Sequence, residues 1–179
     1  MNFGIARQSA ALACTALSLA LFPVLASPAS AKTLVYCSEA SPEGFDPALY
    51  SANSTWDASS KPVYNRLVEF QNGTTTVIPG LAESWTISDD KLTYTFKLRN
   101  NVKFHTTEYF TPSRDLNADD VIFSLQRQLD KTSPWHSYIT GVTWEMTTAM
   151  GLPDMIKEIS KVDDKTVKIV LAAPSASPF

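Results

Sequence analysis

Histidine and cysteine, the side chains that most often hold metals or act as nucleophiles, are few and scattered in this chain. The two histidines, His105 and His136, are far apart, and neither has a cysteine beside it. A zinc site needs three or four such ligands close together, so we expect no metal and no cofactor. His105 follows a strand-like segment and is interpreted as a surface or hydrogen-bonded structural residue. His136 lies in an aromatic loop, where a ligand contact and a structural role both remain open.

Acidic residues occur in pairs, which could in principle support acid–base catalysis. The pairs are Asp89-Asp90, Asp119-Asp120 and Asp163-Asp164. Two of them stand where turns are expected and one stands at a predicted helix start, and carboxylates occupy such positions for structural reasons. No G-x-S-x-G sequence marks a nucleophilic serine, and no glycine-rich loop leads from a strand into a helix. The sequence therefore indicates a protein that is not an enzyme.

The first 31 residues have the pattern of a secretory signal peptide. Arg7 is followed by an apolar run over 10–25 and by small residues up to Ala31, which is typical of cleavage before Lys32. A membrane anchor is the alternative, but the run is shorter than the roughly 20 residues that span a bilayer. Lipid attachment at Cys14 is a minor alternative, because little apolar sequence precedes it. We expect a periplasmic protein.

The charge balance is mildly acidic. The chain has 15 Lys and Arg against 18 Asp and Glu, a net charge of −3, which becomes −4 when residues 1–31 and their single charge, Arg7, are removed. A nucleic-acid surface needs clustered basic residues, so no nucleic-acid partner is expected.

Cys37 would be the one cysteine left in this sequence after cleavage of residues 1–31. An unpaired cysteine in an oxidising compartment is expected to have a disulfide partner. That partner is predicted beyond residue 179; a complete small domain with a buried free thiol is the alternative.

Alternation of apolar and polar residues predicts the strands. It is strictest between Leu92 and Leu98, where Tyr94 and Phe96 share the apolar face. Asn72-Gly73 predicts a hairpin turn. Strands are predicted over 33–36, 67–71, 74–78, 81–88, 92–98, 102–105 and 166–171.

One helix pattern is strong and two are weaker. Asn117 is a predicted N-cap, and an apolar stripe follows that includes Val121 and Leu125, so a helix is predicted from there to before Ser133. A second helix is predicted over 55–67, opened by a capping box at Ser54 and kinked by a proline, and a third over 153–159. Residues 106–116 and 135–151 are predicted to be irregular. Strands joined as hairpins, with separate helices, indicate the α+β class.

Several motifs together resemble family-5 solute-binding proteins of ABC importers. The resemblance covers nearly all of residues 32–179, and its first motif is SPEGFDP (41–47). The others are YNRLV (64–68), IPGLA (78–82), LAESW with the hairpin up to VKFH (81–105), LNADDVIFSLQR (116–127) and MGLP (150–153). The run KTLVYCSEASPEGFDP (32–47) is most similar to the dipeptide-binding subgroup, in which a cysteine at the place of Cys37 forms a disulfide with one further along.

The resemblance implies the N-terminal part of a bilobed periplasmic-binding-protein fold, type II, of the large class with an extra subdomain. Two such lobes close over a peptide by a hinge and deliver it to an inner-membrane permease. The implied divisions are a signal peptide (1–31), the start of the main lobe (32–65), the extra subdomain (66–173) and a return to the main lobe (174–179). A monomer is expected for the longer protein.

The resemblance also implies where a ligand would lie. By position, Ser51, Ala52 and Asn53 match the family's ligand-facing loop, and Trp135 matches an aromatic residue that borders the pocket. Plain turn chemistry at residues 51–53 and a core or rim position for Trp135 are the alternatives. The groups that bind the peptide termini are expected beyond residue 179.

Three functions remain in competition at this point. The first is capture of dipeptides, with haem or a haem precursor as a further ligand. The second, within the same family, is a receptor for nickel or antimicrobial peptides. The third is a secreted hydrolase domain, which would need a catalytic motif outside this sequence.

Overall fold

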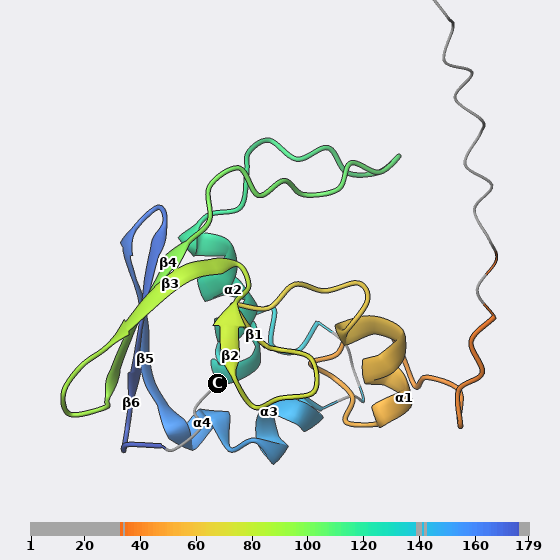
Figure 1. The fold of residues 1–179 in the computed structure, drawn as a ribbon, viewed down its shortest axis with the longest axis horizontal. Helices are drawn as coiled ribbons and strands as arrows, with labels where there is room; N and C mark the ends of the chain where they lie inside the picture. Colours follow the sequence, from red (N-terminus) through yellow and green to blue (C-terminus); the bar gives the residue numbers. More distant parts are fainter. Residues whose placement is uncertain (1–32, 34, 139–140, 142, 176–179) are drawn as a thin grey trace, which may run out of the picture. The chain divides into compact units, whose positions relative to one another are not determined.

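The computed structural model describes residues 33, 35–138, 141 and 143–175. The chain divides into two units, residues 1–36 and 37–179, and the second contains every helix and strand described here (Figure 1). Thr33, Val35 and Tyr36 lie outside any strand. The strand predicted over 33–36 is therefore wrong for these residues, because an extended segment becomes a strand only with a hydrogen-bonded partner. The predicted signal peptide and Cys14 lie outside the described residues.

A four-stranded antiparallel sheet is the larger of the two sheets in the second unit (Figure 1). Its strands are β3 (Ala82–Ile87), β4 (Thr93–Leu98), β5 (Ile156–Asp163) and β6 (Thr166–Leu171), in the order β3-β4-β6-β5. All the pairings are antiparallel, as the hairpin pattern of the sequence predicted.

The two central strands place their alternating apolar residues in the core. Phe96 lies opposite Val167 and Tyr94 opposite Ile169, and all four side chains are buried. The prediction of inward-facing residues in both strands is confirmed. In β3 the alternation is weaker, since a bulge at Ala82–Ser84 shifts the register and Ile87 remains exposed.

Helix α2 (Ala118–Leu129) packs on this sheet through Ala118 and Val121. Its start is fixed by a capping box: the Asn117 side chain accepts from the Asp119 backbone N–H at 3.0 Å, and the Asp120 carboxylate accepts from the Asn117 N–H at 2.9 Å. The prediction of this helix and its N-cap is confirmed.

A second, smaller sheet is formed by strands that precede the four-stranded sheet in the sequence. β1 (Val68–Phe70) pairs with β2 (Val77–Pro79), and Gly73 has a φ of 74° in the turn between them. Gly80 follows β2 at a close crossing, where an added Cβ would lie 2.4 Å from the carbonyl oxygen of Arg66. The hairpin predicted around Asn72-Gly73 is confirmed.

The helix predicted over 55–67 is shorter and lies earlier in the chain. It consists of α1 (Asn53–Thr55) and a π-helical turn, η1 (Trp56–Ser60), in which Lys61 N–H donates to the Trp56 carbonyl at 3.1 Å. The capping box is wrong, because Ala52 is the N-cap and Ser54 donates instead to the carbonyl of Ser41 at 3.3 Å. The buried face is made of serine and threonine, so apolar periodicity could not locate it.

Two further predictions are wrong and one helix was missed. Residues 102–105 form no strand; Val102 instead accepts a single backbone hydrogen bond from Leu116. The helix predicted over 153–159 is α4 (Leu152–Met155), followed directly by β5. A bulge in β5 brings Ile156 and Ile159 to the core at a spacing of three, which imitates a helical pattern. Helix α3 (Glu145–Ala149) lies in the region predicted to be irregular.

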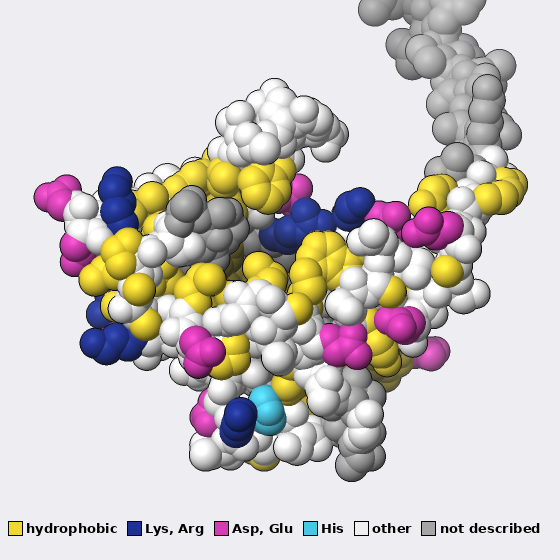
Figure 2. All heavy atoms as spheres, turned by 90° about the horizontal axis from the view of Figure 1, so that it is seen from below, with side chains coloured by type: hydrophobic (Ala, Val, Ile, Leu, Met, Phe, Trp, Pro, Cys, Tyr) yellow, Lys and Arg dark blue, Asp and Glu magenta, His cyan; other side chains and the backbone are white. Residues whose placement is uncertain are grey.

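The surface mixes apolar and charged side chains. On the face shown in Figure 2, basic and acidic groups are interspersed among exposed hydrophobic ones. The exposed large hydrophobic residues include Val63, Phe70, Phe104, Tyr109, Phe110, Phe123 and Trp135. In the described part of the chain, no helix has the length and apolar character needed to span a bilayer.

Candidate functional site

The loop that leads to Ser51 is shaped by one carboxylate. Asp46 Oδ1 accepts from the Ala48 N–H at 3.1 Å, and its carbonyl accepts from the Leu49 N–H at 3.1 Å, which closes a turn around Pro47. Leu49 is buried and anchors the turn from below. The next residues therefore project from a fixed turn.

Residues 51–53 stand at the surface where this loop enters α1. Ser51 and Asn53 are exposed, and Ala52 has extended backbone with φ −66° and ψ 136°. Ser51 Oγ donates to Glu145 Oε2 of α3 at 3.0 Å. The Asn53 side chain makes no hydrogen bond within the described residues.

Trp135, the fourth proposed contact, follows α2 in the chain. It is 55% exposed, and its ring meets Phe123 of α2 edge-on, with centroids 5.9 Å apart and planes at 77°. This aromatic contact fixes the orientation of an indole whose face is open. Among the described residues, no hydrogen bond or ring contact joins Trp135 to residues 51–53.

A bidentate ion pair joins the loop to α2. Arg127 Nη1 and Nη2 each lie 3.0 Å from Asp46 Oδ2, and both side chains are largely buried. The Tyr138 hydroxyl donates to the same oxygen at 3.0 Å. Burial, followed by the hydrogen bond to Asp46, raises the pKa of Tyr138 above its ordinary value, so this hydroxyl keeps its proton at neutral pH.

Arg127 also organises the aromatic residues after Trp135. Its guanidinium lies over the buried ring of Trp144, 5.0 Å from the centroid, and Trp144 Nε1 donates to the His136 carbonyl at 3.0 Å. His136 Nδ1 lies 3.1 Å from the Arg127 carbonyl oxygen. This contact favours the structural role for His136 over a ligand contact.

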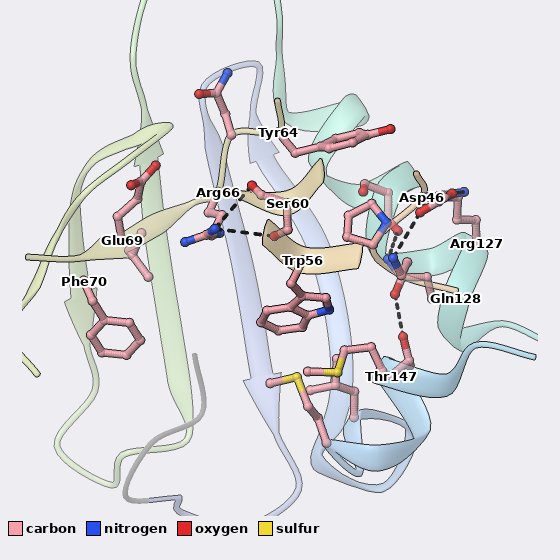
Figure 3. Close-up of a pocket in the computed structure, with 18 of the residues that line it drawn as sticks. Asp46, Trp56, Ser60, Tyr64, Arg66, Glu69, Phe70, Arg127, Gln128 and Thr147 are labelled. Atoms are coloured by element: carbon pink, nitrogen blue, oxygen red, sulfur yellow. Dashed lines mark hydrogen bonds and ion pairs between the residues drawn. The ribbon is translucent and has the colours of Figure 1, made fainter. Parts of the chain in front are cut away.

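A cavity of about 470 Å³ opens beside the ion pair. Figure 3 shows Trp56, Tyr64 and Phe70 around it, with Asp46 and Arg127 paired at one side. Arg66 donates to the Ser60 carbonyl and hydroxyl at 3.2 and 3.4 Å. The lining is mainly apolar and aromatic, although Arg66 and Glu69 contribute charged groups in addition to the paired Asp46 and Arg127.

The described residues do not meet the requirements of a metal site. Across the described ranges, no three His, Cys, Asp or Glu side chains gather closely enough to hold an ion. His105 is exposed at the surface. Cys37 is exposed with a free thiol, and its pairing with a cysteine beyond residue 179 stays a prediction.

This chain is similar to known proteins in sequence and in fold. The sequence model of the bacterial extracellular solute-binding proteins, family 5 (middle region), matches residues 76–179. The chain belongs to this family. The family consists of solute-binding proteins that act in transport, and the predicted membership is confirmed.

Two relatives illustrate the range of the family. The dipeptide-binding protein of Escherichia coli (strain K12) is 56% identical over 163 residues, which cover 91% of this chain and 30% of that protein. The heme-binding protein A of Haemophilus influenzae is 53% identical over 152 residues, 85% of this chain and 28% of that protein. The chain thus spans about 30% of the length of the curated relatives it matches.

A solved family-5 structure has the same fold in this region. The dipeptide-binding protein from Pseudoalteromonas sp. SM9913, in complex with Met-Leu, superposes with a TM-score of 0.72 at 40% identity and covers 78% of this chain and 27% of its own. The predicted fold class, the N-terminal part of a bilobed α+β periplasmic binding protein, is confirmed.

Inspection of the sequence missed most of the residues that hold the candidate site together. Asp46 was interpreted only as a turn residue within a family motif, Arg127 was noted only as part of another such motif, and Tyr138, Trp144 and Glu145 were assigned no role. The sequence offered two local signals for the ion pair: Asp46 is a carboxylate before Pro47, and Arg127 lies near the end of an amphipathic helix. Only the fold brings Asp46 and Arg127 together.

Proposed function

We propose that this chain is the N-terminal part of a periplasmic receptor that captures dipeptides and delivers them to an inner-membrane ABC permease. The observation that carries the proposal is the 56% identity to the Escherichia coli dipeptide-binding protein over 91% of the chain. The similarity to a solved dipeptide-binding protein holding Met-Leu supports it. The receptor is monomeric, is no enzyme and reaches the periplasm after cleavage of residues 1–31.

In this proposal the chain divides as the family resemblance implies. Residues 32–65 begin the main lobe, residues 66–173 form the extra subdomain, and residues 174–179 return to the main lobe. Cys37 forms its disulfide with a cysteine downstream. The charged groups that bind the peptide termini come from the remainder of the receptor, as the family resemblance implies.

Ser51, Ala52, Asn53 and Trp135 are the proposed ligand contacts. The carbonyl of Ala52 accepts from the Thr55 and Trp56 N–H groups, so the extended backbone there offers its N–H to a peptide, a main-chain contact that tolerates many side chains. Exposed polar groups at Ser51 and Asn53 add hydrogen bonds. The open face of Trp135 supplies an apolar wall for a ligand side chain.

Isothermal titration calorimetry of the full-length receptor with a panel of dipeptides, Met-Leu among them, tests the function. The expected result is saturable heat at one dipeptide per receptor. Haem is the second candidate ligand, because heme-binding protein A is 53% identical to the chain. Binding of haemin with no heat from any dipeptide would replace the first proposal by the second.

Failure of both titrations would leave the other family ligands, nickel and antimicrobial peptides, to be titrated next. A hydrolase domain predicts turnover of an ester or peptide substrate and a G-x-S-x-G motif in the downstream sequence. Neither property is expected of the receptor.

A further inference from the structure

The two proposed contact regions come from separate parts of the chain, and among the described residues no hydrogen bond or ring contact joins them. Ser51–Asn53 precede α1, while Trp135 follows α2. A dipeptide that met both regions would need them at a fixed separation, because ordering a loose loop on binding costs affinity. Other residues must therefore fix the distance between residues 51–53 and Trp135.

Helix α2 contacts each region through one side chain, and these two side chains are one helical turn apart. Phe123 meets the ring of Trp135, and Arg127 meets the carboxylate of Asp46. Residues four apart on a helix lie on the same face. The same rigid helix thus carries both regions.

The Asp46 carboxylate transmits the position of α2 to the loop. Its Oδ2 takes both guanidinium nitrogens of Arg127 at 3.0 Å, while its Oδ1 accepts from the Ala48 N–H at 3.1 Å. Only 24% of the Asp46 side chain and 19% of the Arg127 side chain are exposed. Water competes weakly for such a bidentate pair, so the turn before Ser51 is held firmly.

Tyr138 closes the connection between the two loops. Its hydroxyl donates to Asp46 Oδ2 at 3.0 Å and lies 3.2 Å from Arg127 Nη1. The segment that contains Trp135 is therefore tied directly to the carboxylate that shapes the other loop. His136, next to Trp135, is held against the Arg127 carbonyl by the contact at Nδ1.

We propose that Asp46, Arg127 and Tyr138 form a positioning network that sets Ser51–Asn53 and Trp135 at the separation a bound dipeptide requires. The inference rests on the proposed function, and it assigns these three residues an indirect part in ligand affinity. None of them contacts the ligand. The network lowers the cost of binding by ordering both regions before the peptide arrives.

The mildest test is Tyr138→Phe in the full-length receptor, because it removes one hydroxyl and keeps the ring. Loss of one net hydrogen bond from the network is expected to weaken dipeptide binding about two- to tenfold. Tyr109→Phe is the matched control, since Tyr109 is 85% exposed on a distant loop; its affinity should equal that of the wild type. Equal affinity of Tyr138→Phe and wild type would overturn the proposal.

A double-mutant cycle separates positioning from general stability. If Tyr138 acts through Trp135, the effect of Tyr138→Phe on affinity should largely disappear in a Trp135→Ala background. Fully additive effects of the two substitutions would contradict the network. The cycle uses affinities, so a uniform loss of stability does not imitate the result.

Hydrogen exchange in the ligand-free receptor tests the network independently of any ligand. Tyr138→Phe and Asp46→Asn should both speed exchange of the amides from Ala48 to Trp56, while Tyr109→Phe should not. Unchanged exchange in both variants overturns the network even if dipeptides bind. Absence of dipeptide binding by a wild type with slow exchange would contradict the proposed function, and with it the role of the network in affinity.

Discussion

Trp135 combines an open ring face with a fixed orientation, which is what a pocket wall requires. Phe123 meets its ring edge-on, and the neighbouring His136 is held against the main chain of α2. Asp46 has a comparable position in the other loop, since its two carboxylate oxygens serve the turn and the ion pair at once. At the scale of single residues, Trp135 is oriented by one aromatic contact, whereas the Asp46 carboxylate serves two partners.

Trp135→Ala should weaken dipeptide binding by about tenfold, because removing an aromatic contact of roughly 1–1.5 kcal/mol corresponds to that change in affinity. Titration calorimetry on the full-length receptor measures it. Phe110→Ala is a matched control, since Phe110 is 51% exposed on the loop over 106–116. Equal losses in the two variants would show that Trp135 has no special part in binding.

Asp120 provides a test of the α2 cap. Burial raises the pKa of this carboxyl, but hydrogen bonds from Arg114 and the Asn117 N–H outweigh it, so the pKa lies below the ordinary value of 3.8. Asp120→Asn should therefore cost about 1 kcal/mol of stability at neutral pH. The depressed pKa means that this contribution is present above the unfolded-state value and disappears as the pH falls through the lower folded-state value.

Urea denaturation at pH 7 and near pH 3 measures that difference between wild type and Asp120→Asn. Glu108→Gln serves as control, since Glu108 is exposed and makes no ion pair or hydrogen bond within the described residues. If the difference in the free energy of unfolding between wild type and Asp120→Asn did not decrease in acid, the electrostatic role of Asp120 would be refuted.

At the scale of elements, the sequence predicted those whose stability comes from a regular apolar face. β4, β6 and α2 follow the periods of strand and helix closely, and their core residues were identified correctly. α1 with η1 buries serine and threonine, so its helical face carries no apolar signal. The first residues of β5, 156–159, were predicted as helix because a bulge spaces Ile156 and Ile159 like a helical pair.

The candidate site was only partly predictable for a related reason. Residues 51–53 and Trp135 were identified from family resemblance, while their supports depend on pairs distant in the sequence. Asp46 and Arg127 are 81 residues apart, and no local pattern links them. Their pairing becomes visible only when the segment before α1 packs against α2.

The sheet itself can be tested with two valines on paired strands. Val167 of β6 is fully buried, whereas Val162 of β5 is 58% exposed. Val167→Ala should destabilise the protein by about 2 kcal/mol, the cost of two buried methyl groups plus a small cavity. Val162→Ala should change the stability by less than about 0.5 kcal/mol. Thermal denaturation of both variants gives the comparison, and similar effects would argue against the observed register.

At the scale of the whole molecule, the chain contributes a frame rather than a complete binding site. Asp46 and Arg127 pair with each other, and the Glu145 carboxylate accepts a hydrogen bond from Ser51, whereas a dipeptide carries both an ammonium and a carboxylate. The chain spans about 30% of its relatives' length. In the proposed receptor, the remaining sequence supplies the opposite lobe and the charges, and this chain supplies backbone, hydroxyl and aromatic contacts.

The most direct test of this account is hydrogen–deuterium exchange of the full-length receptor with and without a saturating dipeptide. We predict that, within residues 37–179, ligand protection concentrates at Ser51–Asn53 and in the segment around Trp135, with little change in the central sheet. Saturable dipeptide binding that left both of these regions unprotected would contradict the proposed location of the site.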